Sequence, residues 1–249
     1  TISLFSLPMT VSDPIIIGLP EELNTGALLP LQDSLPFVSV ADIEAFRIGA
    51  TRYMAVAKQC SGASCHFTKV GRTVIGQHNV PSAIYTWGPD NSFQQIQTLE
   101  TYGAVDVEYF SYVDGKETGG EELKHFLVFA SLVGTAGFSS PPPVTMWVWD
   151  KGRFILRQSI PADAARSVNV IPRYNDVLLC ISHAGPTNAV EVRRLVKGSY
   201  RAVDESSLEV VWIPSQFLEV VQLIPADRPM NAVMYYPDGL AKPYIAISN

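Results

Sequence analysis

The sequence predicts an all-β fold, a β-propeller built of four-stranded antiparallel blades. The first observation is an internal repeat, because Gln97, Gln158 and Gln222 close three similar segments at spacings of 61 and 64 residues. The second is that four strand-like patterns make up each repeat. Each glutamine also follows an aromatic residue, namely Phe93, Phe154 and Phe217. Units of four strands that recur along a chain describe propeller blades, which bury their faces against one another.

The first strand of each unit has two unlike faces. It begins nine residues after each glutamine, at Asp106–Phe110, Ser167–Ile171 and Asn231–Tyr235, and an earlier copy lies at Asp42–Phe46. Its first and third residues are mostly polar and the others mostly apolar. This alternation is typical of a strand with one polar face.

The second strand is a continuous apolar run, found at Tyr53–Lys58, Phe126–Ser131, Val177–Ser182 and Tyr244–Asn249. Such runs are typical of strands that are buried on both faces. The third strand lies at Ala83–Trp87, Thr145–Trp149 and Ala189–Arg193, and the fourth ends in the glutamines. We expect Gly88, Gly152 and Gly198 in the turns between the third and fourth strands.

The repeat organises residues 1–249 as a single propeller region. Whole blades lie at 42–97 (blade A), 106–158 (blade B) and 167–222 (blade C), with partial blades at 1–32 and 231–249. Insertions fall at 59–80, 133–143 and 199–214. The terminal pieces either share one blade of a closed four-bladed ring or belong to a larger ring. Because an open blade edge needs a cover, we expect additional blades from another segment or chain.

Composition excludes several classes of protein and partner. With 47% hydrophobic and 17% charged residues, the chain suits a packed core and not a disordered segment. No apolar stretch approaches the ~18 residues of a membrane span. The net charge is −6 without a cluster of Lys and Arg, so we expect no nucleic-acid partner. The absence of a Gly-x-Ser-x-Gly elbow and of a phosphate-binding glycine loop favours a protein that is not an enzyme.

The three cysteines favour an oxidising compartment. Cys60 and Cys65 enclose a short polar loop and are the candidate disulfide pair. Cys180 lies in an apolar strand pattern, where we expect a small buried thiol. A zinc site that combines the two loop cysteines with His66 lacks a fourth ligand, so we expect no such metal site.

Paired carboxylates mark the first strands of two blades, Asp42 with Glu44 in blade A and Asp106 with Glu108 in blade B. Residues two apart on a strand point to one face, and the first strand of a blade lines the propeller axis. Two interpretations remain open. The pairs bind a cation or a basic group of a partner in the central channel, or they hydrogen-bond loops and solvate the channel. We expect no other cofactor.

The insertion at 59–80 is the candidate binding loop. It contains His66, Phe67, Lys69 and Arg72, a mixture of basic and apolar side chains that suits a ligand or partner. Binding residues gather in such insertions. The alternative is a solvated loop without a binding role.

Two third strands carry paired aromatic residues, Tyr85 with Trp87 and Trp147 with Trp149. One interpretation is a stacking surface for a sugar or peptide. The other is packing between blades.

Blade B and the junction into it also carry a family resemblance. Residues Gln97 to Phe110 read Gln-x-x-x-Thr-x-Gly-Ala-x-Asp-x-Glu-x-Phe, and Phe126–Ser131 and Met146–Trp149 follow in order. This arrangement, over residues 27–249, resembles the epilepsy-associated repeat (EAR, also called epitempin or EPTP). The resemblance implies part of a seven-bladed propeller of secreted proteins and receptor ectodomains that act in cell recognition. Blade C departs from the pattern, with Ser167 and Asn169 in place of Asp and Glu.

We therefore expect an extracellular protein-recognition module that is not an enzyme and that binds a protein partner through the loops between its strands. Two alternatives remain. One is a small-ligand carrier or a storage or structural protein, which the high apolar content and few charges favour. The other is a propeller hydrolase that uses the paired carboxylates.

Overall fold

Every regular element of the described chain is a β-strand, as the sequence predicts. A computed structural model describes residues 39–67, 74–77, 80–88, 92–115, 121–132, 143–162, 164–173, 176–183, 188–203, 210–236 and 243–248. The predicted segments at 1–32 and 133–142 lie outside these residues.

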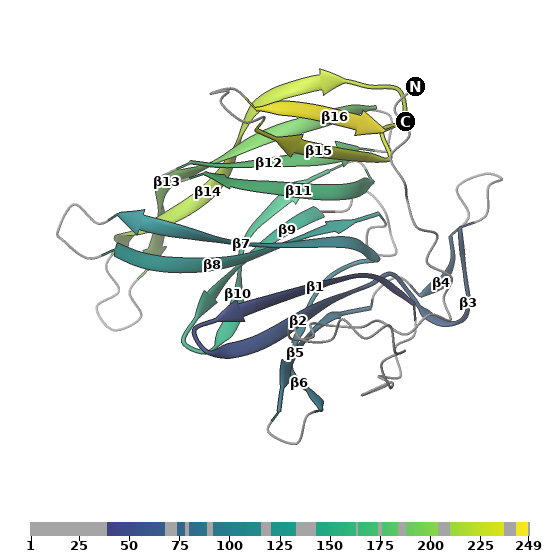
Figure 1. The fold of residues 1–249 in the computed structure, drawn as a ribbon, viewed down its shortest axis with the longest axis horizontal. Helices are drawn as coiled ribbons and strands as arrows, with labels where there is room; N and C mark the ends of the chain where they lie inside the picture. The colour runs from purple at the N-terminus through teal and green to yellow at the C-terminus, as the bar shows by residue number, and fades with distance from the viewer. Residues whose placement is uncertain are drawn as a thin grey trace, which may run out of the picture.

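Three antiparallel four-stranded sheets follow one another along the chain (Figure 1). Blade A contains β1 (Val40–Ile48), β2 (Thr51–Lys58), β5 (Ser82–Trp87) and β6 (Phe93–Leu99). Blade B contains β7 (Ala104–Gly115), β8 (Glu121–Ser131), β9 (Pro143–Asp150) and β10 (Arg153–Pro161). Blade C contains β11 (Ala165–Arg173), β12 (Asp176–His183), β13 (Ala189–Val203) and β14 (Val210–Pro225). A two-stranded sheet, here called sheet D, pairs β15 (Asn231–Tyr235) with β16 (Tyr244–Ser248).

The sheets are arranged as successive propeller blades. Their first strands contact one another in order, β1 with β7, β7 with β11 and β11 with β15. Figure 1 shows β1 and β15 at opposite ends of this series. The first strand of each blade is therefore its inner strand, and the sheets spread outward from it.

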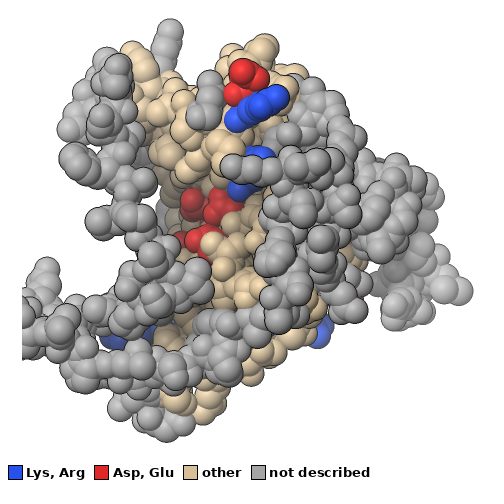
Figure 2. Space-filling view, turned by 90° about the vertical axis from the view of Figure 1, so that its right-hand side faces the viewer, with Lys and Arg blue, Asp and Glu red and all other residues tan. Residues whose placement is uncertain are grey.

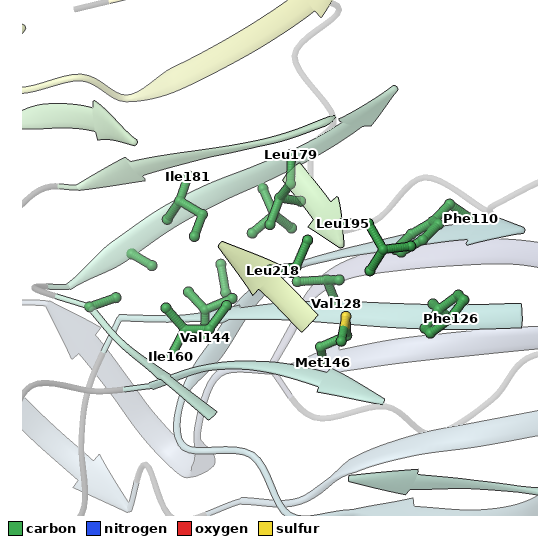
Figure 3. Packing of buried hydrophobic residues seen from close by; sticks show 14 of the residues in the cluster. Phe110, Phe126, Val128, Val144, Met146, Ile160, Leu179, Ile181, Leu195 and Leu218 are labelled. Carbon is green, nitrogen blue, oxygen red and sulfur yellow. The ribbon is translucent and has the colours of Figure 1, made fainter. Parts of the chain in front are cut away.

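The hydrophobic core lies between neighbouring blades. Blades A and B enclose one cluster, which includes Phe46, Leu99, Phe129 and Phe154. Blades B and C enclose a second, which Figure 3 shows from close by. A third lies between blade C and sheet D. Each of these three clusters draws side chains from two sheets, so burial of apolar surface holds the blades together.

The second strands of blades B and C have the predicted burial. Residues Phe126–Ala130 are fully buried, and so are Leu179 and Ile181. The fourth copy differs, because β16 is a strand whose Tyr244 is 49% exposed. The expectation of burial on both faces is wrong there, since no strand in the described part of the chain lies on the outer side of β16.

A β-bulge recurs at the same two places in each blade. The pairing of the inner strand shifts just before Asp42, Asp106 and Ser167. The pairing of the outer strand shifts just before Gln97, Gln158 and Gln222. A bulge changes the direction of the side chain that follows it. The conserved position of the bulges within the blade shows that the three blades are copies of one structural unit.

Two of the three expected glycine turns lie where the pattern placed them. Lys151 and Gly152, with φ of 46° and 89°, form the two-residue turn between β9 and β10. The N–H group of Gly88 donates to Ser92 O at 2.8 Å, at the connection between β5 and β6. The expectation for Gly198 is wrong, because this residue lies inside β13 and pairs with Ser215.

The insertion at 199–214 is also more regular than expected. Strands β13 and β14 stay paired from Ser199 with Pro214 to Val203 with Val210, so most of this insertion lengthens the outer hairpin of blade C. Its β-branched and aromatic residues favour this extension. The insertion in blade A likewise contains a hairpin, made of β3 (Ser61–Phe67) and β4 (Val74–Gln77).

Candidate functional site

The structure brings the two predicted carboxylate pairs together on neighbouring inner strands. Val107 N donates to Asp42 Oδ2 at 3.0 Å. Glu44, two residues further along β1, accepts a hydrogen bond from the backbone of Tyr109. Among the described strands, none pairs with the axial side of an inner strand, so these N–H groups need side-chain acceptors. The carboxylates of β1 therefore hold β7 in place.

The same bonding continues into the next two sheets. Val168 N donates to Asp106 Oδ2 at 2.8 Å, and Met234 N donates to Asn169 Oδ1 at 2.9 Å. At each of these three boundaries between inner strands, a backbone N–H group thus donates to a side-chain oxygen of the preceding strand. Asn169 provides this oxygen from a neutral amide, which explains how blade C keeps the contact without an acidic residue.

The four carboxyl groups form an electrostatically coupled cluster. Burial raises the pKa of Asp106 from 3.8 to about 8, and its hydrogen bond to Asp42 and the charge of Asp42 act in the same direction. Burial also raises the pKa values of Glu44 and Glu108 to about 7, with contributions from Asp42 and Glu44 respectively. Two carboxyl groups can share a hydrogen bond only when one is protonated. The cluster therefore retains protons near neutral pH. Figure 2 shows acidic side chains gathered in a hollowed part of the surface.

The hydrogen bonds of this arrangement join neighbouring blades. Within the described residues, no three His, Cys, Asp or Glu side chains are grouped so that they could hold a metal ion. Oxygen atoms of Asp42 and Asp106 already accept backbone N–H bonds. Of the two interpretations of the paired carboxylates, the geometry favours hydrogen bonding.

The repeated glutamines have a role that sequence reasoning missed. Gln97 Nε2 donates to Phe154 O at 2.6 Å, and Phe154 N donates to Gln97 Oε1 at 2.9 Å. Gln158 makes the same two bonds with Leu218, at 3.2 and 2.8 Å. Each side-chain amide therefore bonds both backbone groups of one residue in the outer strand of the next blade. We call this contact a glutamine clamp. The regular spacing of the glutamines was the available signal.

A buried charged network in blade C was also missed. Glu191 lies between His183, at 3.0 Å, and Arg193, at 2.6 Å. Burial acts to raise the pKa of Glu191, but the hydrogen bonds and charges of His183 and Arg193 outweigh it and lower the pKa. Arg193 also donates to Leu218 O at 2.9 Å. The charged residues within the strand pattern Ala189–Arg193 were the only sequence signal.

The predicted binding residues of the blade A insertion belong to the β3–β4 hairpin and its connection. His66 pairs with Ile75 and Phe67 pairs with Val74 in the backbone register. Lys69 and Arg72 lie between the two strands in sequence and outside the described residues. Figure 1 shows β3 and β4 beside the series of blades and not within it. The insertion is thus a strand-bearing arm, and its binding role stays a prediction.

The cysteines occupy two different environments. Cys60 is disulfide-bonded and almost completely buried. The side chain of Cys65 lies outside the described residues, so the pairing of these two stays a prediction. Cys180 is free and buried, and burial raises the pKa of its thiol to about 12. It behaves as the small apolar group that the sequence indicates.

The paired aromatic residues pack within and between blades. Trp147 is buried and donates to Thr145 Oγ1 at 3.0 Å. Trp149 makes an edge contact with Tyr53 of blade A, with ring centroids 5.2 Å apart. Tyr85 is buried, and Trp87 contacts Phe93 edge-on at 4.7 Å. Packing accounts for these side chains without a ligand.

Comparisons with known proteins do not identify a family. No protein-family model matches the chain, and a search of curated proteins finds no match. Within the described residues, no helix has the length and apolar character needed to cross a membrane.

Proposed function

We propose that this protein is an extracellular recognition module of the EAR type, that it is not an enzyme, and that it binds a protein partner through the β3–β4 arm. The observation that carries the proposal is the arm itself, a two-stranded hairpin that stands outside the four-stranded blades (Figure 1). A rigid blade scaffold that presents such an insertion is the usual arrangement of a binding surface.

The hydrogen bonding of the carboxylates supports a role other than hydrolysis. A glycosidase needs one carboxyl group free to donate a proton and a second free to attack or to activate water. Asp42 and Asp106 instead bond to each other and to backbone N–H groups of neighbouring blades. Their chemistry serves to join the blades.

The disulfide at Cys60 supports an extracellular location. Structural disulfides form and persist in secreted and cell-surface proteins, whereas the cytosol keeps thiols reduced. Cys60 also directly precedes β3, so this disulfide-bonded residue lies where the arm begins.

The experiment compares binding of the fluorescently labelled chain to intact cells by flow cytometry. The arm variant carries Phe67→Ala, Lys69→Glu and Arg72→Glu. The control variant carries Lys151→Glu and Arg153→Glu, the same change of charge at the exposed β9–β10 turn of blade B.

We expect the arm variant to bind at least about ten-fold more weakly and the control variant to bind like the native chain, because loss of an interface anchor commonly costs more than 1.4 kcal/mol. Protease treatment of the cells should abolish binding. Equal binding of the two variants would contradict the role of the arm. Binding that survives protease treatment, or a stoichiometric small molecule in the native mass of the chain, would favour a ligand carrier.

A further inference from the structure

We infer that the outer edge of β16 takes up a two-stranded β-hairpin of the blade pattern, which completes sheet D and receives a glutamine clamp from Gln222. The partner is defined by its chemistry. It is an antiparallel strand pair with an apolar face toward blade C and, in its outer strand, a residue that offers both backbone groups to Gln222.

The first argument is that Gln222 lacks the contact made by its two counterparts. Gln97 and Gln158 are half-buried, and each clamps a residue of the next blade. Gln222 follows the same β-bulge but is exposed, and its side chain makes no hydrogen bond within the described residues. Among the described residues, Gln222 of blade C therefore lacks the clamped residue that blades B and C provide for Gln97 and Gln158.

Burial next to the three glutamines supports the same conclusion. The residue two positions after each glutamine points into the core between blades. Leu99 and Ile160 are 0% and 1% exposed at this position. Ile224, the third member, is only half-buried. The inner part of blade C is covered by sheet D through Ala232 and Met234, so the uncovered part lies toward the outer strand.

The strand pairing of sheet D identifies what fits there. The second strands β2, β8 and β12 each pair with a third strand, β5, β9 and β13. Strand β16 pairs only with β15 among the described elements. Among the described residues, no strand pairs with its other edge, and an edge of this kind is a template for strand addition. Two added strands would extend sheet D to the width of blades A, B and C.

The existing clamps define the outer strand of the partner. Phe154 and Leu218 are the clamped residues, and each lies four positions before the next glutamine in the sequence. Both are large, apolar and buried. A proline at this position would have no N–H group to donate to the glutamine. The hairpin β9–β10 of this chain meets all of these requirements, and it is already the partner of Gln97.

The experiment therefore appends residues 132–161 after Asn249, so that a second copy of β9–β10 follows β16 through its native connection. We expect the melting temperature of the extended chain to rise. Gln222→Ala should then lower the melting temperature of the extended chain by about 2–4 °C, because the clamp is worth about one hydrogen bond or more, and should leave the original chain within about 1 °C.

The matched control is the extended chain with proline in place of the phenylalanine that corresponds to Phe154 in the appended copy. This control should lose the dependence on Gln222. An equal effect of Gln222→Ala in both chains would show that the original chain already fills the clamp, for example with residues 12–32, and would overturn the proposal. No effect in either chain would overturn it as well.

A second measurement decides the question if the extended chain does not fold. A free peptide of residues 143–161 is added to the original chain, and hydrogen exchange at the β16 amides is followed. We expect protection that Gln222→Ala reduces. Exchange rates that the peptide does not change would overturn the proposal.

Discussion

The carboxyl group of Asp106 accepts a hydrogen bond from the backbone N–H group of Val168 at 2.8 Å and so connects blade B to blade C. The same carboxyl group is hydrogen-bonded to Asp42 of blade A. One acidic side chain therefore links three successive inner strands. The protonation state of Asp106 affects all of these contacts. The stability of the series of blades therefore depends on pH.

We predict that the protein loses stability as pH rises from about 5 to 8. The pKa of Asp106 is about 8 in the folded chain and near 4 when unfolded, so the folded state binds more protons within this window. The raised pKa values of Glu44 and Glu108 act in the same direction. Asp106 alone then loses about 3–4 kcal/mol across the window, so the melting temperature should fall by roughly 7–15 °C.

The matched variant is Asp106→Asn, whose amide oxygen can still accept from Val168, as Asn169 accepts from Met234. We expect a flatter pH profile and a higher melting temperature than the native chain at pH 8. A native profile that rises with pH over this window would contradict the shared-proton arrangement.

We predict that Gln97→Ala destabilises the chain by about 1–3 kcal/mol, because both backbone groups of Phe154 lose their partner. The free energy of unfolding in urea is the measurement. Gln222→Ala removes an exposed side chain and should change this free energy by less than about 0.5 kcal/mol. Similar losses for the two variants would show that the clamp contributes nothing specific.

We predict that Glu191→Ala costs about 3–5 kcal/mol, since it leaves His183 and Arg193 buried without their acidic partner. Glu191→Gln keeps an acceptor oxygen and should cost less. Urea unfolding of the two variants side by side tests this order. A larger cost for Glu191→Gln than for Glu191→Ala would contradict the role of the acceptor oxygen.

We predict one reactive thiol per unfolded chain without reductant and three after reduction. Cys180 is free, Cys60 is disulfide-bonded, and the sequence has three cysteines. Mass spectrometry after alkylation in denaturant counts the thiols. A disulfide-linked dimer under the same conditions would exclude the Cys60–Cys65 pairing.

The strands could be predicted because their patterns repeat, but the phase of the second strand in blade C could not. Ser167 and Asp106 occupy the same position in their blades, and they pair with Ser182 and Ala130 respectively. Ser182 is the last residue of Val177–Ser182, whereas Ala130 is the last but one of Phe126–Ser131. The sequence alignment of these two segments is therefore wrong by one residue. A continuous apolar run has no alternation that fixes its phase. The register became visible only through the bulges of the partner strand.

The candidate site was predicted in position and only partly in role. Alternation on the first strands correctly placed Asp42 and Asp106 on the inner strands. It could not reveal that their carboxylate oxygens accept hydrogen bonds from backbone N–H groups more than 60 residues away, at Val107 and Val168. Such long-range pairing depends on how the blades stack, which a local pattern does not contain.

The glutamine clamps point in one direction along the chain. Gln97 bonds Phe154, which lies 57 residues later in the chain, and Gln158 bonds Leu218, which lies 60 residues later. During synthesis, the glutamine side chain of a newly made blade thus has no clamped residue until the next blade has left the ribosome. We expect folding to proceed vectorially from the first blade to the last, with each blade acting as the template for the one translated after it.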